Sequence, residues 1–221
     1  MAGNSVFSWE LIKGFLPAAL MTLQVTALGI SAGLLLGLVF GLLRLARNPL
    51  VNAPAKLYIY VIRGTPLLVQ LLLLYFGLYH FVKLDQLTSA VVALGVHNGA
   101  YIAEIIRGAI QSVDRGQREA GISLGMTGPK VMRRIILPQA VKRAIPPLGN
   151  QFIIALKDSS LASAIGVREL LLYSRQQASA NAMTLEMMLL ASVFYLIMTS
   201  ILTFLTRTAE KRLQISDHRT S

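Results

Sequence analysis

One uncharged segment of 30 residues, from Gly14 to Leu43, constrains the fold of this chain more than any other feature. The hydrocarbon core of a bilayer is crossed by about 20 helical residues, so this segment is long enough to span a membrane with some tilt. The composition agrees, because 14% of the residues are charged, whereas soluble domains carry about a quarter. The sequence therefore predicts an all-α integral membrane protein.

Four further apolar segments follow, and we expect each of them to cross the membrane as a helix. They cover Leu57–Val82, Leu87–Ile110, Ala144–Leu156 and Met187–Thr206. The third of these four is short and contains Pro146, Pro147 and Gly149, residue types that disfavour a continuous helix. We therefore predict five spans, of which the fourth is interrupted.

The basic residues predict how these spans are oriented. Three of them lie between Arg44 and Lys56, eight between Arg107 and Arg143, and four between Arg207 and Arg219. Basic loops stay on the cytoplasmic side of a membrane, so these segments are expected inside, with the N-terminus outside and the C-terminus cytoplasmic. An odd number of spans requires the same arrangement. We expect an interfacial segment at residues 1–15, a membrane domain at 16–208 with a cytoplasmic loop at 111–143, and a cytoplasmic tail at 209–221.

Charge and cysteine content exclude several classes of protein. The formal charge of +11 would suit a nucleic-acid binder, but such a protein needs a soluble core, and this chain offers spans separated by basic loops. The absence of Cys excludes disulfides and thiolate metal sites. Nucleic acid is therefore not an expected partner, whereas the lipid bilayer is.

Four glycines recur at every fourth position in the first span: Gly29, Gly33, Gly37 and Gly41. This spacing places all four on one helix face, where another backbone can approach closely. The partner is either another helix of the same chain or a second subunit, and we favour packing within the chain.

The loop at 111–143 is too regular for a disordered tether. Glu119, Ile122, Leu124 and Met126 indicate a short helix that Gly125 and the pair Gly128–Pro129 would end. A second helical stretch is predicted from Lys130 to Leu137, ending at Pro138. A partly apolar helix outside the membrane has to bury its apolar face against the lipid surface or against another protein.

These same residues resemble a known family. The pattern Glu119-Ala120-Gly121, then Gly125, then Ile136-Leu137-Pro138 is similar to the EAA loop of bacterial ABC importer permeases. It departs from the family's Glu-Ala-Ala by Gly121. Further blocks resemble the polar amino-acid branch of that family: Arg63–Gln70, Ala100–Glu104, Gly116–Gln117, Pro138–Ala140, Pro146–Asn150 and Lys157–Leu161.

The resemblance implies a type I importer permease in the bacterial plasma membrane. Such a permease pairs with a second copy or a paralogue and imports polar amino acids. It receives its substrate from an extracytoplasmic solute-binding protein and rests on a dimer of ATPase subunits, which bind ATP and Mg. The residues implied to contact the ATPase are Glu119, Ala120, Gly121, Leu124, Gly125 and Met126.

The chain itself is not expected to be an enzyme or to hold a cofactor. It lacks the phosphate-binding pattern G-x-x-x-x-G-K-[ST], since the nearest stretch, Gly125 to Lys130, is followed by Val131. His80, His97 and His218 are scattered along the sequence and predict no metal site. We expect His97 to be a hydrogen-bonded packing residue rather than a proton relay.

Ionisable residues inside spans are costly and mark functional positions. For Arg63 and Lys157 we expect snorkelling to the interface or an ion pair that fixes a helix end. Glu104 is expected to pair with Arg107 near the inner boundary. Asp158 is the candidate for substrate contact, with structural pairing as the alternative. By resemblance, Thr65, Asn98, Tyr101 and Ser160 line the same cavity.

Two other functions are compatible with a five-span chain. An ion-coupled secondary transporter would need an internal repeat and an ion site, and neither is visible in 221 residues. A non-transporting membrane scaffold would explain the basic loop, but it would not explain Asp158 or the interrupted span. The sequence therefore favours the ATP-driven importer.

Overall fold

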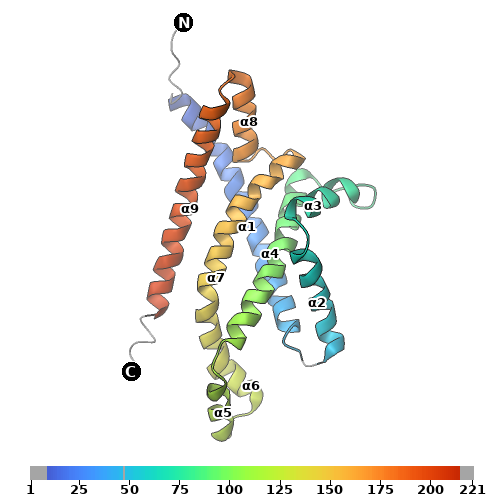
Figure 1. Cartoon of the computed structure of the whole chain (residues 1–221), viewed down its shortest axis with the longest axis vertical. Coiled ribbons are helices and arrows are strands. Elements are labelled where there is room, and N and C mark those ends of the chain that lie inside the picture. The colour runs from blue at the N-terminus through green and yellow to red at the C-terminus, as the bar shows by residue number, and fades with distance from the viewer. Residues whose placement is uncertain (1–8, 47, 215–221) are drawn as a thin grey trace.

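The computed structural model describes residues 9–46 and 48–214, and these residues form helices and their connections without a strand (Figure 1). The α-helices are α1 (Trp9–Leu43), α2 (Pro49–Arg63), α3 (Leu67–Leu72), α4 (Gln86–Gln111), α5 (Arg115–Ser123), α6 (Gly128–Val131), α7 (Leu137–Asp158), α8 (Leu170–Asn181) and α9 (Thr184–Gln214). Two π-helical segments, η1 (Leu73–Gly77) and η2 (Met132–Ile136), and one 3-10 segment, η3 (Ser159–Ile165), complete the described chain. The predicted all-α fold is confirmed for this part of the chain.

Three helices are long and apolar enough to cross a membrane by themselves: α1, α4 and α9. The pair formed by α2 and the segment from α3 to Gly77 makes a fourth if it is counted as one broken span, because its two parts are bent by 103°. α7 is not among these candidates, since it carries charges near both ends. The count of five spans therefore remains a prediction.

The second span differs from the helix predicted over 57–82. α2 begins at Pro49, where Asn48 caps it by accepting a hydrogen bond of 2.9 Å from the backbone N–H of Leu50. The helix ends at Arg63, and α3 starts after Pro66 in a new direction. Proline lacks an N–H and disfavours helical geometry at the preceding residue, so the break falls at Gly64–Pro66.

The interruption predicted for Ala144–Leu156 is wrong. α7 runs without a break from Leu137 to Asp158 with Pro146 and Pro147 inside it. Neighbouring helices and small local adjustments let membrane helices tolerate proline. The predicted end at Pro138 is also wrong, because the π-helical segment η2 leads directly into α7 and Pro138 lies in the first turn of α7.

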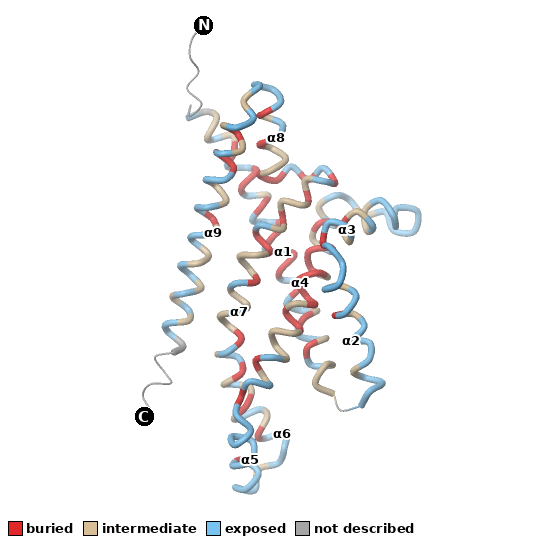
Figure 2. The backbone as a smooth tube through the Cα atoms, viewed as in Figure 1, coloured by how far each residue is buried: buried red, intermediate tan, exposed pale blue. Residues whose placement is uncertain are grey.

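The glycine stripe of α1 packs against α4 within the same chain, which confirms the favoured alternative. A methyl group added at Gly29 would lie 2.8 Å from the Cβ of Leu94, and one at Gly33 would lie 3.3 Å from the backbone oxygen of Gly95. α4 contributes small residues in return, since a methyl group at Gly95 would lie 2.8 Å from the Cβ of Ala32. α1 and α4 therefore pack closely along these glycines, and Figure 2 shows buried residues on both helices.

Loops of like charge gather at one end of the bundle. The end of α1, the start of α2, the segments α5 and α6, and the C-terminal end of α9 all lie toward the lower end in Figure 1, whereas α8 and the start of α1 lie at the opposite end. At the opposite end, Asp85 caps α4 and accepts a hydrogen bond of 2.6 Å from the Thr88 hydroxyl. That hydrogen bond holds the pKa of the Asp85 carboxyl below its usual range.

The predicted boundaries of the terminal segments fall partly on residues without a described structure. Of the interfacial segment at residues 1–15, positions 9–15 form the first turns of α1 and continue into it directly. Of the tail at 209–221, α9 includes the residues up to Gln214. Residues 1–8 and 215–221 lie outside the described part of the chain.

Replacing Gly33 by Val is expected to destabilise the protein more than the same change at its neighbour Leu34. The side chain at position 33 would press on the backbone of Gly95 and Gly99, which cannot yield, and such overpacking costs about 1–3 kcal/mol. Leu34 is exposed on the outer face of α1. The measurement is the midpoint of thermal aggregation of the purified chain in detergent. Equal midpoints for Gly33→Val and Leu34→Val would contradict the interpretation.

Candidate functional site

A single side chain, Gln70, stabilises the break between α2 and α3. Its amide nitrogen donates hydrogen bonds to the backbone oxygens of Ile62 (2.8 Å) and Thr65 (3.0 Å) and to the hydroxyl of Thr65 (2.8 Å). The Thr65 hydroxyl itself donates to the backbone oxygen of Val61 at 2.9 Å. Carbonyls that lose their helical partners at a break need other donors inside a membrane, and Gln70 supplies them.

The same amide joins the break to α4. The side-chain oxygen of Gln70 lies 3.1 Å from Nδ1 of the buried His97. The amide nitrogen of Gln70 already faces carbonyl oxygens, so its oxygen has to be the acceptor, and Nδ1 of His97 has to carry the proton. This is the hydrogen-bonded packing role that the sequence predicted for His97.

Two aromatic contacts complete a group that we call the elbow cluster: Arg63, Thr65, Gln70, His97 and Tyr101. The rings of His97 and Tyr101 lie 5.1 Å apart, centre to centre. The guanidinium carbon of Arg63 lies 5.1 Å above the centre of the Tyr101 ring. A pocket of about 390 Å³ opens beside the cluster between α2, α3, η1 and α4, and its polar lining residues are Thr65 and Gln70.

Asn98 lies apart from the elbow cluster, on a face of α4 that is closed to solvent. Its side chain is 0% exposed. Its amide nitrogen donates to the backbone oxygen of Leu94, and its side-chain oxygen accepts a hydrogen bond from Gln151 of α7, both at 2.8 Å. The bond to Gln151 ties α4 to α7 in the interior.

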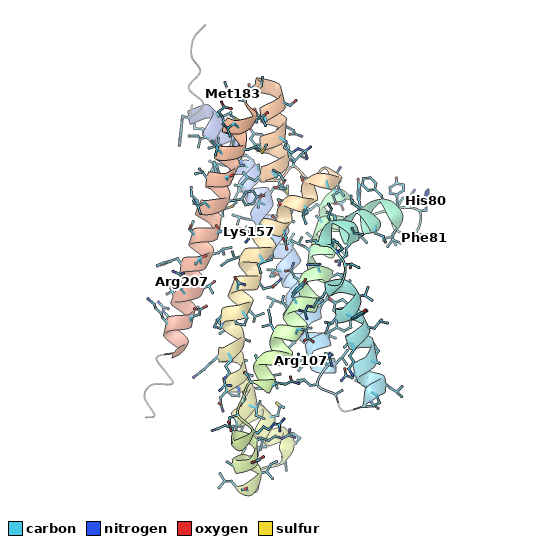
Figure 3. All side chains as sticks on the ribbon, viewed as in Figure 1. His80, Phe81, Arg107, Lys157, Met183 and Arg207 are labelled. Atoms are coloured by element: carbon cyan, nitrogen blue, oxygen red, sulfur yellow. The ribbon has the colours of Figure 1, made fainter. Side chains whose placement is uncertain are left out.

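Asp158 and Ser160 lie where α7 passes into η3. The hydroxyl of Ser160 donates to the backbone oxygen of Lys157 at 2.7 Å, and Figure 3 labels Lys157 on the upper part of α7. Asp158 is half-buried, and no side chain in the described residues forms an ion pair with it within 4 Å. η3 packs on α3 through Ala162 and Ile165. Asp158 and Ser160 thus belong to a segment that adjoins the elbow but has no hydrogen bond to the elbow cluster.

The C-terminal ends of α1 and α4 are joined by an ion-paired group. Nη2 of Arg107 lies 2.7 Å from Oε2 of Glu104, and Nε of Arg107 donates to both carboxylate oxygens at 3.1 Å. Nε of Arg44 lies 3.6 Å from Oε1 of Glu104. The predicted pairing of Glu104 with Arg107 is confirmed, and Figure 3 shows Arg107 toward the lower end of α4.

Glu169, which no sequence pattern singled out, is 0% exposed. Its carboxylate caps α8 by accepting hydrogen bonds of 2.8 Å from the backbone N–H groups of Leu171 and Leu172, and it accepts another of 2.9 Å from the hydroxyl of Tyr195 on α9. The Thr22 hydroxyl of α1 accepts a hydrogen bond of 3.1 Å from the Leu170 N–H. Glutamate is not among the preferred capping residues, so the local sequence gave no signal for this role.

The loop at 111–143 folds as a compact unit with a core of its own. Asp114 caps α5 by accepting a hydrogen bond of 2.7 Å from the Gly116 N–H, and the chain turns after α5 at Gly125, whose φ of +78° suits glycine. Gly121 is buried, and a methyl group there would lie 2.8 Å from Cγ2 of Val131 and 2.9 Å from Cδ1 of Ile135. Gly121, which stands where the family has alanine, thus lets α5 pack closely against α6 and η2.

The other face of α5 carries apolar side chains without a cover. Leu124 is 83% exposed and Ile122 is 51% exposed, and Glu119 and Ala120 are also exposed beside them. Met126 is half-buried and packs on the loop's own core. Of the six residues predicted to contact a partner ATPase, Glu119, Ala120, Leu124 and Gly125 are therefore accessible, whereas Gly121 supports the fold of the loop.

Comparison with known proteins assigns this arrangement to a family. Residues 29–215 match the family described as binding-protein-dependent transport system inner membrane component. The chain belongs to this family. The glutamine transport system permease protein GlnP of Escherichia coli strain K12 is 42% identical over 210 residues, covering 94% of this chain and 96% of GlnP. The arginine transport system permease protein ArtQ of Bacillus subtilis is 35% identical over 199 residues, covering 89% of this chain and 91% of ArtQ.

Solved structures of this transport family agree. The crystal structure of an amino acid ABC transporter with histidines contains a chain that is 41% identical, with a TM-score of 0.89, covering 92% of this chain and 95% of that one. The MetNI methionine ABC transporter, at 20% identity and a TM-score of 0.80, shares the fold. The resemblance to amino-acid ABC importer permeases, inferred from the EAA-like loop, is confirmed, and no similarity favours the secondary transporter or the scaffold.

Asn98→Ala and Gln151→Ala are expected to be coupled in their effect on stability. Each change leaves the other side chain without its buried partner, and the double variant should be less destabilised than the sum of the two by about 0.5–1.5 kcal/mol. The measurement is a double-mutant cycle of thermal midpoints in detergent. Asn98→Ala combined with Ser192→Ala, on an exposed part of α9, is the control and should be additive. Additivity of the first pair would contradict the hydrogen bond.

Proposed function

We propose that this chain is the membrane-spanning permease subunit of an ATP-driven importer for polar amino acids. The observation that carries the proposal is the 42% identity to a glutamine permease over 94% of the chain. The family's description as binding-protein-dependent supports an importer fed by a solute-binding protein. The substrate class follows from relatives named for glutamine, arginine and cystine transport.

In this proposal the chain lies in the bacterial inner membrane with five spans, the N-terminus outside and the C-terminus in the cytoplasm. The three candidate spans and the broken pair supply four crossings, and α7 supplies the fifth. The gathering of the basic loops at one end of the bundle supports this orientation. The partners are a second permease copy or a paralogue, and a dimer of ATPase subunits that binds ATP and Mg and supplies the hydrolysis.

The loop at 111–143 transmits the closure of the ATPases to the spans. Leu124 and Ile122 present apolar surface of the kind that another protein covers, and Glu119 beside them offers a carboxylate for a basic residue of the ATPase. Because η2 continues directly into α7, a displacement of α5 and its core is carried into that helix. ATP binding would bring two such loops together and open the passage outward, and hydrolysis would return it to the inward-facing state.

The proposed substrate path uses the residues singled out in the sequence. Thr65 and Tyr101 belong to the elbow cluster, and Asp158 and Ser160 lie on the segment that packs beside α3. Asn98 has an indirect part in this path, because its hydrogen bond to Gln151 joins α4 to α7. A half-buried carboxylate such as Asp158 without an ion-pair partner is suited to an ammonium group, which every amino acid carries.

The decisive experiment is an ATPase assay on the assembled transporter. The chain is co-expressed with its ATPase and reconstituted in lipid nanodiscs with the cognate binding protein and a panel of amino acids. We expect stimulation of hydrolysis by polar amino acids, at least severalfold above the basal rate, and none by leucine or alanine. If the complex is stable but no amino acid of the panel changes its rate of ATP hydrolysis, the proposed substrate class is contradicted.

Glu119→Lys and Gly125→Asp are expected to uncouple hydrolysis from transport. The first reverses the charge on the exposed face of α5, and the second places a side chain at a left-handed position, which costs roughly 1 kcal/mol, and adds charge to that face. Substrate uptake into proteoliposomes should fall by roughly tenfold or more, equivalent to about 1.4 kcal/mol of lost coupling, while the protein remains in the membrane.

The matched control for these variants is Glu186→Lys, a charge reversal in the first turn of α9, at the opposite end of the bundle. It should leave uptake close to the unmodified level. Normal uptake with Glu119→Lys and Gly125→Asp would show that the loop has no part in coupling ATP hydrolysis to transport.

A further inference from the structure

Arg63 is placed where an unpaired charge is costly. It ends α2 and rests on Tyr101 of α4. Tyr101 precedes Gln111, the inner end of α4, by ten residues and follows Gln86 by fifteen, which correspond to rises of about 15 Å and about 22 Å. Both distances exceed the reach of an arginine side chain. The guanidinium of Arg63 therefore reaches neither end of α4 by snorkelling, and its level differs from that of Glu104 by three residues, about 4.5 Å of helical rise.

The ion pair expected as the other explanation for Arg63 is also missing among the described residues, where no carboxylate lies within 4 Å of its guanidinium. The acidic group of α4, Glu104, forms its ion pairs with Arg107 and Arg44 and attracts Arg63 only at longer range. Asp158, at the end of α7, also has no ion pair in the described chain. His97, which donates to Gln70, and Tyr101 are the other titratable groups of the elbow cluster.

The surroundings of Arg63 fix its position but leave its donors free. Tyr101 covers one face of the guanidinium, and Gln70 holds the helix break in place directly after Arg63. The side chain is exposed in the single chain. Lipid offers no acceptor for a guanidinium at this depth, so the exposed side has to face a wet passage or a partner subunit.

We propose that Arg63 binds the α-carboxylate of the transported amino acid, with Tyr101 and Gln70 as its positioning residues. This inference rests on the proposed function and names the chemistry of its recognition site. A guanidinium presents a planar pair of N–H donors that matches the two oxygens of a carboxylate. The carboxylate is common to all amino acids, so Arg63 selects the class of substrate, whereas other side chains of the passage select among its members.

The test measures binding to the permease–ATPase complex without the binding protein, which would itself select ligands. The ligands are the amino acid that stimulates hydrolysis most and its α-carboxamide, which lacks only the negative charge. Ligand-dependent thermal stabilisation at millimolar concentrations gives the apparent affinities. For the unmodified complex we expect stabilisation by the amino acid and little by the carboxamide.

Arg63→Gln should weaken binding of the amino acid by roughly ten- to hundredfold, because a charged hydrogen-bonded pair is lost, and should leave the carboxamide unaffected. Arg63→Lys keeps the charge without the planar fork and should restore part of the affinity. Lys56→Gln is the matched control, since Lys56 is exposed on the same face of α2 two turns earlier. It should bind both ligands as the unmodified complex does.

Several results would overturn the inference. One is equal stabilisation of the unmodified complex by both ligands, and another is undiminished discrimination in Arg63→Gln. If Arg63→Gln instead dissociates the permease pair, seen by light scattering, while discrimination persists, Arg63 contacts the partner permease. If amino acids stimulate hydrolysis but Arg63 proves irrelevant, only this inference fails. If no amino acid stimulates hydrolysis or stabilises the complex, the proposed function fails with it.

Discussion

The close packing of α1 against α4 is the interaction on which the rest of the structure depends. In lipid, apolar side chains gain little by leaving their surroundings, so helices associate where small residues let backbones approach. Gly29, Gly33, Gly95 and Gly99 provide that approach along the middle of the bundle. The opposite face of α4 then carries His97 and Tyr101 toward the broken helix, while Asn98 reaches α7. One rigid pair of helices thereby positions both the elbow and the interior bond.

The break between α2 and α3 shows how a membrane protein keeps an irregular backbone at depth. Unpaired carbonyls are expensive there, and Gln70 satisfies two of them while its oxygen engages α4. The break frees the end of α2, so that Arg63 and Thr65 are presented at an opening rather than buried in a continuous helix. The break in the helix therefore both requires the hydrogen bonds of Gln70 and exposes the polar side chains of the site.

Much of this could be predicted from the sequence, because hydropathy, charge and spacing report on long elements. The uncharged first span, the role of its glycines, the pairing of Glu104 with Arg107 and the helix–turn of the loop follow from residue patterns alone. The positions at which helices break do not follow from residue patterns alone. Pro146 and Pro147 lie inside the continuous helix α7, whereas α2 ends three residues before Pro66, where Gln70 supplies donors to the freed carbonyls. Glu169 was missed because glutamate is not a preferred helix cap and because the third donor to its carboxylate comes from α9.

The continuity of η2 with α7 has a mechanical consequence. The loop core of Val113, Val131, Ile136 and Ala140 is packed directly onto the first turn of α7, and the 22 residues of that helix continue to Asp158 without a flexible joint. Such a rod is about 33 Å long. A displacement of α5 would therefore act on the near end of this helix, which the hydrogen bond of Gln151 to Asn98 ties to α4 between its two ends.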